Sequence, residues 1–136
     1  MAYSPDVVSV LIGINDVWRL HTNGREKEGV GVRIYEAVYK KLLCALKQQK
    51  NCQLVLMEPF LFCDDPHDTL LKHLRDYINV VDVLAEQFDT VLVPLQNEID
   101  DEIKNSASDK WSDDMVHPFV WAHFWISQRW IEAAKV

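Results

Sequence analysis

The apolar residues of this chain fall into two kinds of pattern, short continuous runs and longer stripes with helical spacing. Continuous runs of β-branched and aliphatic residues cover residues 7–12, 53–57 and 90–93. Runs of this length and composition are typical of strands buried on both faces of a sheet. Pro59 and Pro94 follow the second and third runs, and a residue without a backbone N–H is expected to end a strand.

Between these runs, apolar residues recur every three or four positions and predict amphipathic helices. Two long stripes cover residues 30–50 and 68–88, and Asp68 is a candidate N-cap for the second. A shorter helix is predicted over residues 96–105, and an aromatic-rich helix from about residue 119 to 134. We expect the aromatic side chains of this last helix to belong to the core.

Strands and helices therefore alternate from one end of the chain to the other. That order is typical of an α/β protein with a parallel sheet, whose neighbouring strands are joined by right-handed crossovers. The sequence contains no internal repeat, low-complexity tract or linker. We predict one α/β domain over residues 1–136.

Composition narrows the classes of function. The 136 residues carry a net charge of −7, which argues against nucleic acid or an anionic membrane as partner, because both require clustered Lys and Arg. No apolar run predicts a membrane span, and no signal peptide is recognisable. Cys44, Cys52 and Cys63 lack a CxxC spacing and indicate free thiols, which favours a cytoplasmic location, although an export signal preceding residue 1 would leave the compartment undetermined.

The run at 7–12 leads directly into a Gly-Ile-Asn-Asp segment at 13–16. Open parallel α/β sheets bind ligands at the carboxyl ends of their strands. At such a place the Asn15 amide could stabilise a developing oxyanion without titrating. Alternatively, Asn15 and Asp16 only cap the loop that follows the strand. Trp18 could line a pocket for an acyl group or a sugar, or it could pack against the next helix.

A second candidate site precedes the last helix, in the Asp-Met-Val-His-Pro segment at 114–118. An Asp three residues before a His, across a turn, can accept the Nδ1–H of the imidazole and leave Nε2 free as a general base. Pro118 suits the first turn of the helix that follows. The alternative is a surface His117 beside an acidic Asp114 that only marks the start of the helix.

Together the two segments resemble the SGNH hydrolases, also called GDSL esterases. GxND after a buried strand looks like the family's third block, and DxxHP before an aromatic-rich helix looks like its fifth. The resemblance implies a three-layer αβα, flavodoxin-like fold and serine esterase chemistry. The sequence departs from the family pattern at Met115 and Ala122, where glycine is common, and both positions lie beside the functional residues.

The resemblance also implies roles for individual residues. Asn15 would be the side-chain donor of the oxyanion hole, His117 the general base, and Asp114 the residue that orients His117. The other residues expected to line the ligand site are Gly13, Asp16 and Trp18.

The family's nucleophile is a Ser in a Gly-Asp-Ser motif, and none of the serines here stands in that context. The chain therefore looks like the C-terminal part of a family member, truncated before its third block. We expect an esterase that acts on small acyl or acetyl esters without a cofactor, of which this chain alone is inactive. The alternative is a non-catalytic α/β scaffold that acts through self-association or ligand binding.

Two further expectations concern a partner and a metal. In the family's strand order a missing strand would lie beside residues 7–12, and an unpaired strand edge readily pairs with another chain. We expect a homodimer through this edge (Val7–Ile12) or through the C-terminal helix. No metal site is predicted, because the neighbouring acids and histidines match no metal motif. These neighbours are Asp64, Asp65, His67 and His73.

Overall fold

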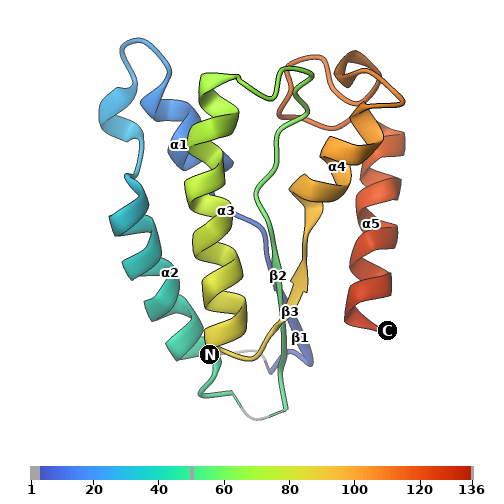
Figure 1. Ribbon diagram of the computed structural model, residues 1–136. Helices are drawn as coiled ribbons and strands as arrows, with labels where there is room; N and C mark the ends of the chain where they lie inside the picture. Colours follow the sequence, from blue (N-terminus) through green and yellow to red (C-terminus); the bar gives the residue numbers. More distant parts are fainter. Residues whose placement is uncertain (1–3, 50, 136) are drawn as a thin grey trace.

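A parallel sheet forms the centre of the protein, in a computed structural model that describes residues 4–49 and 51–135 (Figure 1). Its strands are β1 (Val7–Val10), β2 (Gln53–Met57) and β3 (Val91–Val93), in the order β1-β2-β3. Both pairings are parallel, as predicted. Within the described residues, β1 therefore pairs on one side only, with β2.

Helices cover both faces of this sheet and give the predicted three-layer αβα arrangement. α1, α2 and α3 lie over one face, whereas α4 and α5 lie over the other (Figure 1). The predicted α/β class is confirmed. The helices are α1 (Ile14–Leu20), α2 (Val32–Leu46), α3 (Thr69–Gln87), α4 (Leu95–Ile103) and α5 (Val120–Ala134), with single 3-10 turns at Glu26–Glu28 and Ser108–Lys110.

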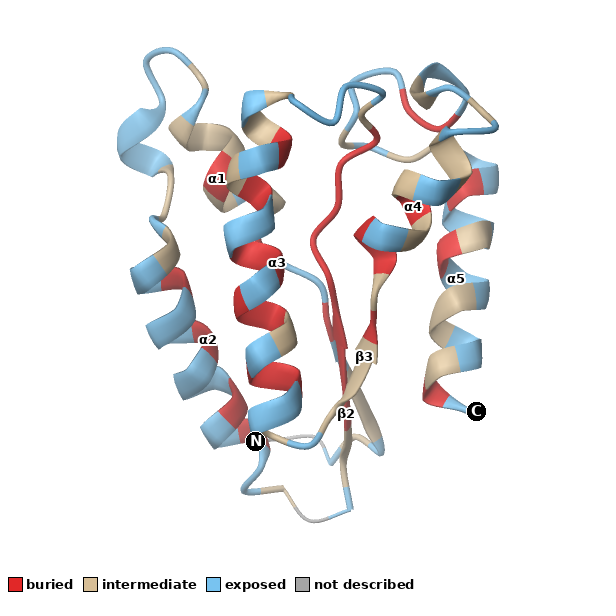
Figure 2. Ribbon diagram, in the orientation of Figure 1, coloured by how far each residue is buried: buried red, intermediate tan, exposed pale blue. Residues whose placement is uncertain are grey.

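β2 is buried on both faces because its side chains alternate between two cores. Leu54 and Leu56 pack with residues of α2 and α3. Val55 and Met57 pack with residues of α4 and α5. All four side chains are buried, and the strand is red along this length in Figure 2. This two-sided burial accounts for the continuous apolar run in the sequence.

α3 has both features that the sequence predicts for it. The Asp68 carboxylate accepts a hydrogen bond from the N–H of Leu71 at 2.9 Å, so Asp68 is the N-cap. This bond satisfies one of the backbone N–H groups that a helix start leaves without a partner. The predicted apolar face is buried, and it includes Leu71, Leu74, Ile78, Val81 and Ala85.

The structure differs from the predicted elements just after the first strand. β1 ends at Val10 rather than at residue 12, and α1 begins at Ile14, where no helix was predicted. α1 has only seven residues, one of them buried, and no side chain caps its start. Its sequence therefore lacks both the apolar stripe and the cap by which a helix is predicted.

α5 was predicted to bury its aromatic side chains, and for two of them this is wrong. Ala122 is fully buried, whereas Trp121 is 44% exposed and Phe124 is 68% exposed. The small side chain lets the helix backbone approach the sheet closely and turns the larger rings outward. The deeply buried aromatic residue of this region is Trp111, which precedes the helix and stacks on Phe62.

Candidate active site

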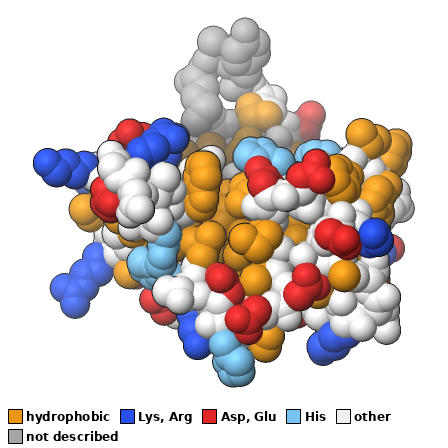
Figure 3. All heavy atoms as spheres, turned by 90° about the horizontal axis from the view of Figure 1, so that it is seen from above, with side chains coloured by type: hydrophobic (Ala, Val, Ile, Leu, Met, Phe, Trp, Pro, Cys, Tyr) orange, Lys and Arg blue, Asp and Glu red, His pale blue; other side chains and the backbone are white. Residues whose placement is uncertain are grey.

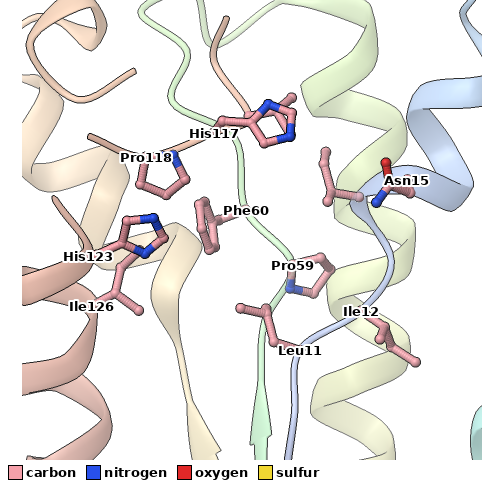
Figure 4. Close-up of a pocket in the computed structure, with 11 residues that line it drawn as sticks. Leu11, Ile12, Asn15, Pro59, Phe60, His117, Pro118, His123 and Ile126 are labelled. Atoms are coloured by element: carbon pink, nitrogen blue, oxygen red, sulfur yellow. The ribbon is translucent and has the colours of Figure 1, made fainter. Parts of the chain in front are cut away.

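A pocket of about 270 Å³ opens at the carboxyl edge of the sheet, where the ends of β1 and β2 meet the loop before α5 (Figure 4). Its lining is mostly apolar, and hydrophobic side chains gather at this end of the molecule when it is seen from above (Figure 3). Parallel α/β sheets bind ligands at this edge. The lining residues are Leu11, Ile12, Ile14, Asn15, Pro59, Phe60, Val116, His117, Pro118, His123 and Ile126.

The loop after β2 forms one wall of the pocket and is held by Gln96 of α4. The Gln96 side chain accepts the N–H of Leu61 at 2.7 Å and donates to the Leu61 carbonyl at 3.1 Å. In turn, the Glu58 carboxylate accepts the backbone N–H of Gln96 at 2.9 Å. Glu58 and Gln96 are buried, so these bonds satisfy polar groups that water does not reach. The loop is thereby fixed without belonging to a strand or helix.

A tight turn built around Asp114 presents His117 to the pocket. Asp114 Oδ1 accepts the backbone N–H groups of Val116 at 2.9 Å and of His117 at 2.8 Å. Met115, between Asp114 and Val116, has a φ of 68°, and its carbonyl accepts the N–H of Phe62 at 2.9 Å. This last bond joins the His117 turn to the loop after β2.

The second carboxylate oxygen orients the imidazole. Asp114 Oδ2 lies 2.6 Å from Nδ1 of His117. Hydrogen bonds from the backbone N–H and the imidazole of His117 hold the pKa of Asp114 well below its usual range, so the carboxylate stays ionised at neutral pH. An ionised carboxylate only accepts, so in the neutral imidazole Nδ1 carries the proton and Nε2 is a free base.

Asn15 borders the same pocket from the first turn of α1. The chain turns sharply before it at Gly13, whose φ of 126° is rarely accessible to other residues. A Cβ at Gly13 would also lie only 3.1 Å from Pro59 Cγ and from the Tyr35 hydroxyl. None of the hydrogen bonds found among the described residues uses the Asn15 amide, which can therefore donate to a ligand.

The other residues expected to line the site lie outside the lining of this pocket. Gly13 is buried at the start of α1, and Trp18 lies later in the helix. Asp16 is half-buried, and burial raises its pKa. The lining instead includes Leu11 and Phe60, which sequence reasoning missed. The available signal was that Leu11 lies at the end of the run at 7–12 and that Phe60 directly follows Pro59, which ends the run at 53–57.

No serine of the described residues borders the pocket. Ser112, the serine closest in sequence to His117, is buried, and its hydroxyl donates to Asp114 Oδ1 at 3.1 Å. The Ser9 hydroxyl accepts the indole N–H of Trp130 at 2.8 Å. These two hydroxyls take part in structural hydrogen bonds rather than in a bond to His117.

The described residues contain neither a three-ligand metal cluster nor a helix that could span a membrane. Among the described residues, no three His, Cys, Asp or Glu side chains are grouped so that they could hold a metal ion. In the same part of the chain, no helix combines the length and the apolar character needed to cross a membrane. Cys44, Cys52 and Cys63 are free thiols, and Cys44 is exposed.

A parallel sheet with a His–Asp pair and an unbonded amide at its carboxyl edge is an arrangement also found in α/β enzymes that use a histidine base. The model of the GDSL-like Lipase/Acylhydrolase family matches residues 1–120, and the chain belongs to this family. The resemblance to SGNH hydrolases is thereby confirmed.

Two relatives illustrate the likeness. The acetylxylan esterase of Geobacillus stearothermophilus is 30% identical over 132 residues, which are 96% of this chain and 60% of the esterase. The crystal structure of an acetylxylan esterase from the same organism has a TM-score of 0.93 at 28% identity and is matched over 99% of this chain and 62% of its own. A Parabacteroides merdae structure of the GDSL-like lipase type has a TM-score of 0.86 at 34% identity, over 98% and 62% of the two chains. The chain thus spans about 60% of the length of the curated relative.

Proposed function

We propose that this chain is part of an SGNH-type serine esterase, to which it contributes the general base and an oxyanion donor. The contact of 2.6 Å between His117 Nδ1 and Asp114 Oδ2 carries the proposal. This contact leaves Nε2 of His117 free at the pocket, which Asn15 also borders. Family membership supports the same assignment of roles.

In the proposed reaction, a serine hydroxyl from outside residues 1–136 attacks the ester carbonyl. His117 Nε2 takes the hydroxyl proton as the new O–C bond forms, and Asp114 stabilises the resulting imidazolium. The Asn15 amide donates a hydrogen bond to the oxyanion of the tetrahedral intermediate. His117 then gives the proton to the leaving alcohol as the ester C–O bond breaks, and water releases the acyl group by the same steps.

Small acyl esters, acetyl esters among them, are the substrate class that the pocket favours. Leu11, Phe60 and Ile126 offer apolar surface to a short acyl chain beside His117. The volume of about 270 Å³ suits a small group. The Geobacillus stearothermophilus relative is an acetylxylan esterase, which supports the same class.

We further propose that residues 1–136 are an N-terminally truncated single domain that is inactive by itself. The sequence has no Gly-Asp-Ser motif, and the hydroxyls of Ser9 and Ser112 bond to Trp130 and Asp114. The open edge of β1 is the place where a strand carrying the nucleophile would add to the sheet.

Hydrolysis of p-nitrophenyl acetate tests both proposals. The two proteins to compare are residues 1–136 alone and the same residues joined to the N-terminal remainder of the Geobacillus esterase. We expect turnover only by the joined protein, where His117→Ala should lower kcat by about 10³-fold and Asn15→Ala by about 10²-fold. The control is His67→Ala, since His67 is exposed and outside the pocket lining.

Two results would contradict these proposals separately. If residues 1–136 alone hydrolyse the ester and His117→Ala abolishes this turnover, the proposal that the nucleophile lies outside these residues is refuted. Turnover by the joined protein that neither His117→Ala nor Asn15→Ala reduces would refute the assigned site.

A second candidate function is that of a non-catalytic scaffold that self-associates. The open edge of β1 favours it, as do Val120 and Phe124 of α5, which are 76% and 68% exposed. Unpaired strand edges and exposed apolar patches commonly form protein contacts. We propose a homodimer through β1 or α5, which is compatible with either function.

A further inference from the structure

Two histidines meet where the C-terminal end of α1 lies against α3. Nε2 of His21 lies 2.9 Å from Nδ1 of His73, although the two residues are 52 positions apart. The His73 ring packs edge-on against Tyr77, with 5.7 Å between the ring centroids. Neither histidine borders the pocket at His117, so the pair is separate from the proposed esterase site.

We propose that His21 and His73 are two ligands of a site for a divalent transition metal of the Cu²⁺ or Ni²⁺ type. Imidazole nitrogens bind such ions at about 2.0–2.1 Å, so two nitrogens bound at a right angle lie about 2.9 Å apart. In the structure the two nitrogens share a hydrogen bond of 2.9 Å, so the rings already lie close enough for one ion to reach both. Among the divalent ions of the first transition row, Ni²⁺ and Cu²⁺ bind nitrogen ligands more tightly than the ions before them, which favours them at an imidazole pair.

The surroundings of the pair allow both rings to bind one ion. His21 is exposed and can rotate, whereas Tyr77 restrains the half-buried His73. A rotation of His21 directs both nitrogen lone pairs to a common point. The ring that donates in the present hydrogen bond moves its proton to its other nitrogen, and both imidazoles stay neutral. Water completes the coordination, since the described residues provide no group of three ligands.

Metal binding would tie the end of α1 to α3. α1 has only seven residues and carries Asn15 in its first turn. A helix this short depends on tertiary contacts for its stability. The metal would therefore stabilise the helix that presents Asn15 to the pocket, although the metal site itself does not rest on the proposed esterase function.

Titration of residues 1–136 with Ni²⁺, followed by NMR, tests the site. One equivalent of this paramagnetic ion should broaden the amide signals of His21, Thr22 and His73 before any others. In calorimetric titrations, His21→Gln and His73→Gln should each weaken binding by about tenfold or more. His67→Gln removes an exposed histidine outside the pair and should leave binding unchanged.

Either of two results would overturn the proposal. One is broadening centred on His117 or Cys44, and the other is unchanged Ni²⁺ binding by the double variant His21→Gln/His73→Gln. Circular dichroism without metal checks that each variant is folded. Because His21 is exposed, His21→Gln is expected to fold like the parent, and it decides the matter alone if His73→Gln does not fold.

Discussion

His117 Nδ1 lies 2.6 Å from Oδ2 of Asp114, while Oδ1 of the same carboxylate accepts two backbone N–H groups. One oxygen therefore fixes the turn, and the other fixes the imidazole. Because different oxygen atoms fix the turn and the imidazole, a substitution that preserves only one acceptor can separate the two effects.

Asp114→Asn should preserve the turn and release the ring. Its amide oxygen can still accept the N–H groups of Val116 and His117, but its NH₂ group cannot accept the Nδ1–H of His117. We expect the melting temperature to change little and the downfield Nδ1–H signal of His117 in the ¹H NMR spectrum to disappear.

Asp114→Ala should remove both roles and lower the free energy of unfolding by about 1–2 kcal/mol. Asp113→Ala is the matched control, because Asp113 is a neighbouring exposed acid. Equal losses of stability in the Asn and Ala variants would show that the two oxygens do not act separately.

Gln96 should be essential for the wall of the pocket. Gln96→Leu leaves the buried N–H and C=O of Leu61 without their partners at 2.7 and 3.1 Å. We expect urea denaturation to show a loss of about 2–4 kcal/mol in the free energy of unfolding. The exposed Gln128→Leu provides the control. A Gln96→Leu variant as stable as that control would mean that the loop is held by other contacts.

The elements predicted well are those whose buried residues follow one regular periodicity. The side chains at 53–57 alternate between two cores, which gives a continuous apolar run. α3 buries one face and begins at the Asp68 N-cap, which gives a helical stripe with a start signal. Both patterns can be recognised in the sequence. α1 has one buried residue and no side-chain cap, and neither strand nor helix periodicity could reveal it.

Separation along the chain decides how much of the candidate site could be predicted. Asp114 and His117 are three residues apart, so a single turn accounts for their contact. The bond between Leu61 and Gln96 joins positions 35 apart, and the His21–His73 contact joins positions 52 apart. Such contacts arise only when helices pack on the sheet, and no local pattern encodes them.

The buried Glu58 carboxyl should make stability depend on pH. Burial, with Asp82 nearby, raises the pKa of Glu58 to about 7 from an ordinary value of 4.5. Between these two pH values the folded state binds more protons than the unfolded state, so the contribution of Glu58 to stability falls as the pH rises. The full change is on the order of 3 kcal/mol.

Glu58→Gln keeps an acceptor for the Gln96 N–H and cannot ionise. The variant should match the parent in stability near pH 4.5 and become progressively more stable than the parent as the pH approaches 8. Urea denaturation at a series of pH values measures the difference, with the exposed Glu36→Gln as control. A Glu58→Gln variant that is less stable than the parent at pH 8 would contradict the prediction.

The unpaired edge of β1 predicts self-association. The N–H of Gln53 donates to the carbonyl of Asp6 at 2.8 Å, so by alternation Val7 and Ser9 direct their backbone groups away from β2. Sedimentation velocity at micromolar concentration should show a dimer. Val7→Pro removes one outward N–H without breaking a bond to β2, and it should yield a monomer if β1 forms the interface.

Phe124→Glu tests the alternative interface on α5, because it places a charge where an exposed ring now lies. Val38→Glu on α2 is the control, since Val38 is also an exposed apolar residue, 58% accessible, but lies on the opposite face of the sheet. Dissociation by Phe124→Glu alone would assign the interface to α5, and dissociation by Val7→Pro alone would assign it to β1. A parent protein that sediments as a monomer would refute both, because an open strand edge and an exposed helix face would then coexist without association.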